Sequence, residues 1–151
     1  VTHWSRIGRL RRSKMPFLTK DNQFGGGASA GIQSAIAGRL LCDTYLSSRE
    51  FVKEVSYTLG ALASNLLKME RKEFDVADVP AMYGSSSALH GLVKHAEEDA
   101  WFSIAIMFHL SVLPLTRQLT CLSGSLWNKT LQGARAQRIE YLLLHEFRAR
   151  K

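Results

Sequence analysis

Apolar residues recur at three- and four-residue steps over much of this chain, and the longest such pattern covers residues 85–112. This spacing places the apolar side chains on one broad face of an α helix. The face consists of Leu89, Leu92, Val93, Ala96, Ala100, Ile104, Met107, Phe108 and Leu110. We therefore predict one long helix over residues 85–112, with Pro114 restarting the chain beyond it.

Shorter helices are predicted on both sides of this one. Ser47 and Ser48 can cap a helix that runs to Val55, because their hydroxyls accept hydrogen bonds from first-turn amides. Ser56 can cap a second helix, which shows an apolar stripe and ends among cations that suit the negative end of the helix dipole. These residues are Leu59, Leu62, Ala63, Leu66 and Leu67, followed by Lys68, Arg71 and Lys72. Further helices are expected at residues 75–82, ended by Tyr83 and Gly84, at 115–122, ended by Ser123 and Gly124, and at 126–147.

The N-terminal quarter of the chain has a different pattern. Residues 3–12 lack helical periodicity and favour an extended strand. Four glycines within residues 22–34 predict a flexible loop. Residues 38–46 contain a compact apolar group around Asp43, as expected of a buried strand that ends in a functional or capping carboxylate. The pattern as a whole predicts a helix-rich α/β chain with one or two strands near its N-terminus.

Length and composition fit one globular domain. A chain of 151 residues with 46% hydrophobic and 22% charged residues can bury an ordinary core. It contains no apolar run of 18 residues and no signal-peptide pattern, so we expect neither a membrane span nor a membrane partner. The first residue is Val1, which favours a piece excised from a longer protein. Cys42 and Cys121 lack disulfide or zinc spacing and are expected to be reduced core thiols.

Basic residues concentrate near the two ends of the chain, which carries a net charge of +7. The first cluster is Arg6, Arg9, Arg11, Arg12, Lys14 and Lys20, and the second is Lys129, Arg135, Arg138, Arg148, Arg150 and Lys151. Trp4 lies beside the first cluster and Trp127 beside the second. Arginine pairs with phosphate through two N–H groups, so these clusters are candidate nucleic-acid contacts. A solvated basic surface with buried tryptophans explains the pattern equally well.

The residues around Asp99 are the main candidates for chemistry. His95 and Asp99 are four positions apart and share one helical face. With Glu98 they could hold a divalent ion, but an ordinary ion pair is the more common outcome of this spacing. A two-metal nuclease site needs carboxylates from several elements, and the chain has no Asp-x-Glu strand motif. Neither a hydrolase nucleophile elbow nor a phosphate-binding loop occurs.

Several stretches taken together resemble one polymerase family. They are residues 3–12 (HWSRIGRLRR), 38–43 (GRLLCD), 56–59 (SYTL), 98–100 (EDA), 112–115 (VLPL) and 133–147 (GARAQRIEYLLLHEF). In these stretches the chain resembles the DNA polymerase alpha catalytic subunits, which are family B replicative polymerases that extend primers made by a primase partner. The resemblance covers most of the chain, and the glycine-rich loop is the main unmatched part.

The resemblance implies that the chain is the later part of an exonuclease-like domain with a ribonuclease H-like fold, which leads toward the polymerase palm. In proofreading relatives the third exonuclease motif is a Tyr four residues before an Asp. Asp99 matches that aspartate, whereas His95 stands in place of the tyrosine. The first and second exonuclease motifs are absent, and the polymerase aspartates are expected beyond Lys151. This departure is consistent with a family that does not proofread.

We therefore expect residues 1–151 to be one partial domain with a structural role, without a complete catalytic site and without a metal. For the parent polymerase the resemblance implies nucleotidyl transfer in the nucleus with Mg²⁺, a DNA and RNA–DNA primer-template, and primase and accessory subunits as partners. One alternative is a free-standing nucleic-acid-binding module whose contacts would be Arg6, Arg9, Arg11, Arg12, Arg135 and Arg138. Another is a small metal-dependent nuclease that uses Glu97, Glu98 and Asp99.

Overall fold

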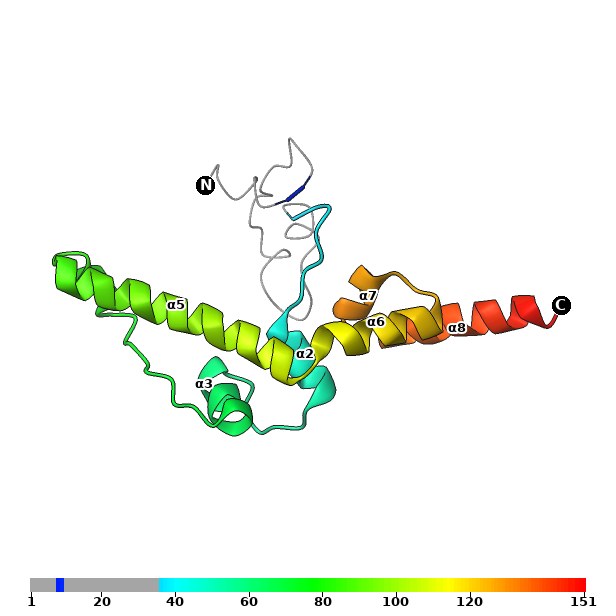
Figure 1. Cartoon of the computed structure of the whole chain (residues 1–151), viewed down its shortest axis with the longest axis horizontal. Coiled ribbons are helices and arrows are strands. Elements are labelled where there is room, and N and C mark those ends of the chain that lie inside the picture. The colour runs from blue at the N-terminus through cyan, green and yellow to red at the C-terminus, as the bar shows by residue number, and fades with distance from the viewer. Residues whose placement is uncertain (1–7, 10–35) are drawn as a thin grey trace.

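The computed structural model describes residues 8, 9 and 36–151, and their regular structure is helical (Figure 1). The elements are α2 (Thr44–Phe51), α3 (Leu59–Leu62), the π-helical turn η3 (Ala63–Leu67), α4 (Val79–Met82), α5 (Ser86–His109), α6 (Val112–Ser123), α7 (Trp127–Leu131) and α8 (Arg135–Ala149). The prediction of a helix-rich chain is confirmed, and the described residues contain no strand. The expected strand at residues 3–12 lies outside the described residues except for a bend at Gly8 and Arg9, and the loop predicted at residues 22–34 lies wholly outside them.

Two helices in succession, α5 and α6, form the long axis of the described part (Figure 1). They meet at a bend of 47°, where Ser111 adopts a left-handed conformation with φ of 50°. The helices α2 and α3 lie against α5 on one side, and α6 contacts both α7 and α8. Among the described helices none alone has the length and apolarity to cross a membrane; α5 and α6 meet that criterion only as a bent pair, on length and composition.

The long helix predicted from the apolar spacing is confirmed, but α5 ends at His109 and not at residue 112. Ser85 caps α5 by accepting a hydrogen bond from Ala88 N through its hydroxyl at 3.1 Å. α6 begins at Val112, before Pro114, because a proline in the first turn removes no intrahelical hydrogen bond. Gly124, with φ of 66°, ends α6 as predicted, since glycine adopts the left-handed conformation without a Cβ clash.

The strand predicted at residues 38–46 is wrong. Asp43 is the N-cap of α2, and its Oδ1 accepts hydrogen bonds from Tyr45 N at 2.9 Å and from Leu46 N at 3.2 Å. Asp43 therefore starts a helix rather than ending a strand. Its carboxylate accepts hydrogen bonds from first-turn amides that have no partner within the helix. Ser47 and Ser48, predicted as caps, lie inside α2 and are buried.

Two other predicted boundaries are wrong. Thr58, and not Ser56, caps α3 through a 3.4 Å bond from Ala61 N. The single helix predicted over residues 126–147 is two helices, α7 and α8, because the chain turns at Gly133 with φ of 75°. That left-handed conformation cannot continue a right-handed helix.

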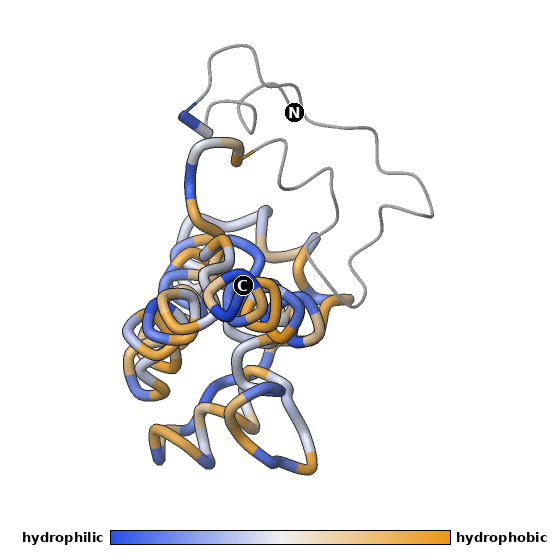
Figure 2. The backbone as a smooth tube through the Cα atoms, turned by 90° about the vertical axis from the view of Figure 1, so that its right-hand side faces the viewer, coloured by the Kyte–Doolittle hydropathy of each residue, from blue (hydrophilic) through white to orange (hydrophobic). Residues whose placement is uncertain are grey.

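The buried core of the described part is small. It consists of Leu62, Ala63, Phe102, Ile106, Val112 and Leu131, contributed by α3, η3, α5, α6 and α7. Large apolar side chains remain exposed along α5 and α8, among them Val93, Trp101, Phe108, Ile139 and Phe147. Figure 2, which turns the view of Figure 1 by 90°, shows hydrophobic and hydrophilic stretches alternating along the helices. The helices are therefore amphipathic, but only part of their apolar surface is covered.

Candidate functional site

Asp99 lies on α5 and is held by an arginine that follows η3. Arg71 Nε donates to Asp99 Oδ1 at 2.6 Å and Arg71 Nη2 donates to Asp99 Oδ2 at 2.8 Å. Two parallel N–H···O bonds of this kind form the bidentate pair for which the guanidinium is suited. Both oxygens of the Asp99 carboxylate therefore accept from Arg71.

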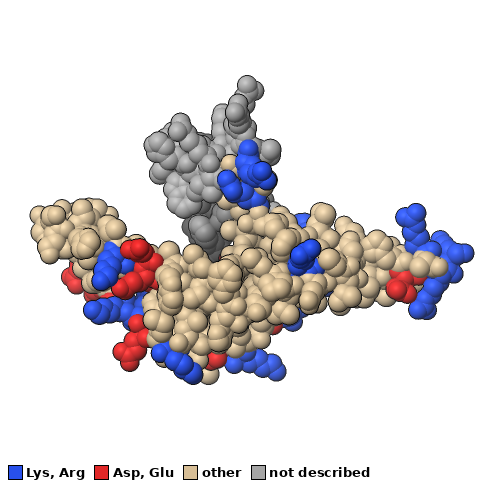
Figure 3. Space-filling model, viewed as in Figure 1, with Lys and Arg blue, Asp and Glu red and all other residues tan. Residues whose placement is uncertain are grey.

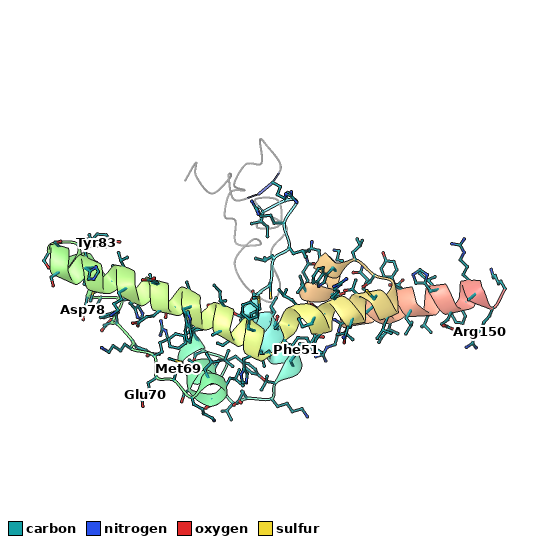
Figure 4. All side chains as sticks on the ribbon, viewed as in Figure 1. Phe51, Met69, Glu70, Asp78, Tyr83 and Arg150 are labelled. Carbon is teal, nitrogen blue, oxygen red and sulfur yellow. The ribbon has the colours of Figure 1, made fainter. Side chains whose placement is uncertain are left out.

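The segment that carries Arg71 is directed toward α5 by the end of η3. Lys68 adopts a left-handed conformation with φ of 57°, which ends the π-helical turn. The following residues run beside α5 toward α4, as the labels of Met69, Glu70 and Asp78 show in Figure 4. Arg71 from this segment reaches Asp99, and Phe74 reaches His95.

His95 completes this cluster one helical turn before Asp99. Its Nε2 lies 3.6 Å from Asp99 Oδ2 and 3.4 Å from Arg71 Nη2. Its ring makes an edge-to-face contact with Phe74, with ring centroids 4.7 Å apart. The His95 side chain is 13% exposed, so it is enclosed by the cluster rather than directed into solvent.

The pair of Arg71 and Asp99 is ionised at neutral pH. The hydrogen bonds from Arg71 hold the pKa of Asp99 below its usual value, against the opposing effect of partial burial. The same bonds raise the pKa of Arg71. Arg71 Nη1 also lies 3.5 Å from Glu73 Oε1, but Glu73 is 75% exposed and this contact contributes little.

The residues here do not fit an exonuclease metal site. A divalent ion needs free carboxylate oxygens from several elements, whereas Asp99 has both oxygens engaged by a cation. Glu97 and Glu98 are exposed, and the part of the chain that the structure describes holds no group of three His, Cys, Asp or Glu side chains arranged for a metal. The geometry supports an ion pair, the commoner of the two outcomes expected from the sequence.

The second basic cluster is also tied to a carboxylate. Arg138 Nη2 donates to Glu50 Oε1 at 2.6 Å, and these two side chains are only 13% and 14% exposed. Arg135 Nε lies 3.4 Å from the same oxygen, and the Arg135 side chain is 64% exposed. Glu50 comes from α2, so this cluster joins α2 to the first turn of α8.

These contacts bear on the arginines predicted to bind nucleic acid. Arg138 is almost buried and Arg135 keeps an exposed side chain beside Glu50. Arg9 is exposed, and its backbone N–H donates to Ala37 O at 2.9 Å. Arg6, Arg11 and Arg12 lie outside the described residues. Nucleic-acid binding by these arginines stays a prediction.

The sequence did not point to Arg71 or Glu50. Arg71 was assigned only to the cationic end of a helix, and its partner lies 28 positions away. Glu50 was not singled out, and its partners lie 85 and 88 positions away. No local spacing rule relates residues at such separations.

In the described part of the chain, two arginine–carboxylate clusters thus join segments that lie far apart in the sequence. No protein-family model matches the chain. It is 66% identical over 149 residues to the DNA polymerase alpha catalytic subunit of Oryza sativa subsp. japonica and 58% identical over 148 residues to that of Arabidopsis thaliana. The subunit of Mus musculus is 42% identical over 147 residues.

These matches cover 97–98% of the chain but 10% of each relative. The chain is therefore homologous, over nearly its whole length, to one segment of the DNA polymerase alpha catalytic subunits, and the resemblance inferred from its motifs is confirmed. It spans about a tenth of the length of the curated relatives it matches.

Proposed function

We propose that this chain is the helical, structural part of the exonuclease-like region of a replicative DNA-directed DNA polymerase of the alpha type. Residues 1–151 would form one partial domain of ribonuclease H-like fold that leads toward the polymerase palm. The observation that carries the proposal is the bidentate pair of Arg71 with Asp99, at the position where proofreading relatives need a free aspartate. The names of the relatives support a replicative polymerase.

In this proposal the chain hydrolyses no DNA. Asp99 neutralises Arg71 instead of holding a metal ion, and His95 packs against Phe74 instead of orienting a water molecule. The two ion-paired clusters then have a mechanical role. Arg71 with Asp99 holds the segment after η3 to α5, and Glu50 with Arg138 holds α2 to α8.

The parent protein would transfer nucleotides to a primer in the nucleus, with DNA and RNA–DNA primer-template as substrate. Its Mg²⁺ would be held by polymerase residues that this chain does not contain. Its partners would be the primase and the accessory subunits of the polymerase. These properties follow from the family resemblance; the names of the relatives support only the catalytic subunit of a DNA polymerase alpha.

A nuclease assay tests the structural role. We expect the purified chain to leave labelled single-stranded DNA intact in Mg²⁺ or Mn²⁺. Degradation that disappears in Asp99→Ala would overturn the proposal in favour of a small nuclease that uses Glu97, Glu98 and Asp99.

A segment exchange tests the link to the polymerase. The matching segment of the Oryza sativa catalytic subunit is replaced by this chain, and primer extension is measured. We expect extension close to that of the unmodified subunit, and a reduced yield of folded protein when the inserted chain carries Arg71→Ala. A folded exchange protein without extension activity would contradict the proposal.

A further inference from the structure

The second half of α8 carries a surface that the proposed function does not use. There α8 extends past α6 toward the C-terminus (Figure 1). An open hollow of about 460 Å³ lies along it, lined by Tyr141, Leu144, His145, Phe147, Arg148 and Lys151.

The lining residues share one side of the helix because of their spacing. Within α8, Tyr141, Leu144, His145 and Arg148 follow one another at steps of three residues or one position apart, and Phe147 lies three positions after Leu144. Lys151 follows just beyond the end of the helix. Such positions form one stripe along an α helix. His145 of this stripe packs against Gly124 at the end of α6. The two residues are so close that a Cβ on Gly124 would collide with the imidazole.

The charge on this stripe is uncompensated. Glu146 Oε2 lies 3.4 Å from Arg150 Nη2, and both residues belong to the other side of α8. Neither Arg148 nor Lys151 has an ion-pair partner among the described residues, and the hollow is lined by no carboxylate. Figure 3 shows cationic side chains gathered at this end of the molecule, with an acidic group beside them.

Aromatic and cationic groups therefore occur together at one accessible surface. Phe147 is 63% exposed, and the half-buried Tyr141 lines the same hollow nearly three helical turns before Lys151. Unpaired bases stack on exposed aromatic rings, while neighbouring arginine and lysine side chains contact the phosphates. A duplex offers its phosphates to such a surface but keeps its bases stacked inside.

We propose that this stripe on α8 is a contact for single-stranded nucleic acid, in which Arg148 and Lys151 bind phosphates and Phe147 and Tyr141 stack on bases. The choice of nucleic acid rests on the proposed function, but the site is separate from Arg135 and Arg138, which face Glu50. The contact is with backbone and base faces, so it carries little sequence preference.

Fluorescence anisotropy with a labelled oligo-dT of about 20 nucleotides tests this proposal on the full 151-residue chain. We expect binding that weakens as salt rises. The slope of log K against log salt should fall by about 0.7 for each lost phosphate contact, hence by about 1.4 in Arg148→Gln/Lys151→Gln. Arg150→Gln is the matched control, because it removes the same charge from the ion-paired side of α8 and should leave the slope unchanged.

Phe147→Ala should weaken oligo-dT binding about five-fold or more, whereas Leu142→Ala, which removes an exposed apolar side chain away from the stripe, should not. Circular dichroism verifies that every variant keeps its helices. The proposal is overturned if the chain does not bind oligo-dT at low salt, or if it binds duplex DNA more tightly than oligo-dT. It is also overturned if the double variant and the Arg150 control change the salt slope equally, or if the chain binds phosphatidylserine vesicles but not oligo-dT. The segment exchange described above reads primer extension, so its result distinguishes a failure of the proposed function from a failure of this site.

Discussion

Glu50 Oε1 lies 2.6 Å from Nη2 of Arg138, a residue 88 positions further along the chain, and both side chains are nearly buried. Arg135 shares the same carboxylate at 3.4 Å. Both arginines belong to the first turn of α8, where the positive end of the helix dipole disfavours cations. One glutamate from α2 therefore neutralises the start of α8 and fixes the two helices together.

Replacing Glu50 should destabilise the protein strongly. Glu50→Ala leaves the nearly buried Arg138 without its carboxylate, which typically costs about 3 to 5 kcal/mol of the free energy of unfolding. Urea unfolding followed by circular dichroism measures this change. Glu70→Ala, at an exposed position, is the control and should change stability by no more than about 0.5 kcal/mol.

Replacing the two arginines that share Glu50 should cost different amounts of stability. Arg135 is 64% exposed, so Arg135→Ala should cost about 1 kcal/mol or less, while Arg138→Ala should cost several times as much because it leaves Glu50 unpaired and nearly buried. The same unfolding measurement compares them. Equal losses for the two variants would show that Arg138 is not the structural member of the pair.

Arg71 should not be replaceable by another cation. Arg71→Lys keeps the charge but cannot make two parallel bonds to Asp99, so we expect it to lose about 1.5 to 3 kcal/mol of stability, nearly as much as Arg71→Met. Lys72→Met, at the exposed neighbouring position, is the control. Full stability of Arg71→Lys would contradict the bidentate role.

The ion pair of Arg71 and Asp99 should make the free energy of unfolding depend on pH in the acidic range. The pKa of Asp99 is lower in the folded state than in the unfolded chain, where an aspartate titrates at about 3.9. Its stabilising effect is therefore complete above that value and is lost as the pH falls toward the folded-state pKa. Unfolding free energies between about pH 6 and pH 3 should fall less steeply in Asp99→Asn than in the parent chain. Glu97→Gln, two positions away and exposed, should keep the parent slope.

Gly124 should tolerate no side chain while His145 is present. Its φ of 66° costs an L-residue about 1 to 2 kcal/mol, and a Cβ would also collide with the imidazole of His145. We expect Gly124→Ala to destabilise the protein by more than that backbone cost, and His145→Ala to remove part of the excess. A double-mutant cycle measures this coupling, and simple additivity would exclude the contact.

Features that depend on neighbouring residues could be read from the sequence. The existence and the start of α5 follow from apolar spacing, and the end of α6 follows from Gly124. The boundaries that were wrong had several local solutions. Asp43 could end a strand or start a helix, and Gly133 could lie within a helix or break it, so the sequence alone did not choose between them.

The sequence by itself determined that the chain is helix-rich, that it carries two basic clusters, and that it resembles one segment of a polymerase catalytic subunit. Only the tertiary structure decided what the charged residues do. The packing of the helices pairs Asp99 with Arg71 and Glu50 with Arg138, and it leaves Arg148 and Lys151 beside the exposed ring of Phe147. The reason is physical: helix geometry relates residues three or four positions apart, whereas ion pairs across 28 or 88 positions exist only once the packing of the helices has brought their side chains together.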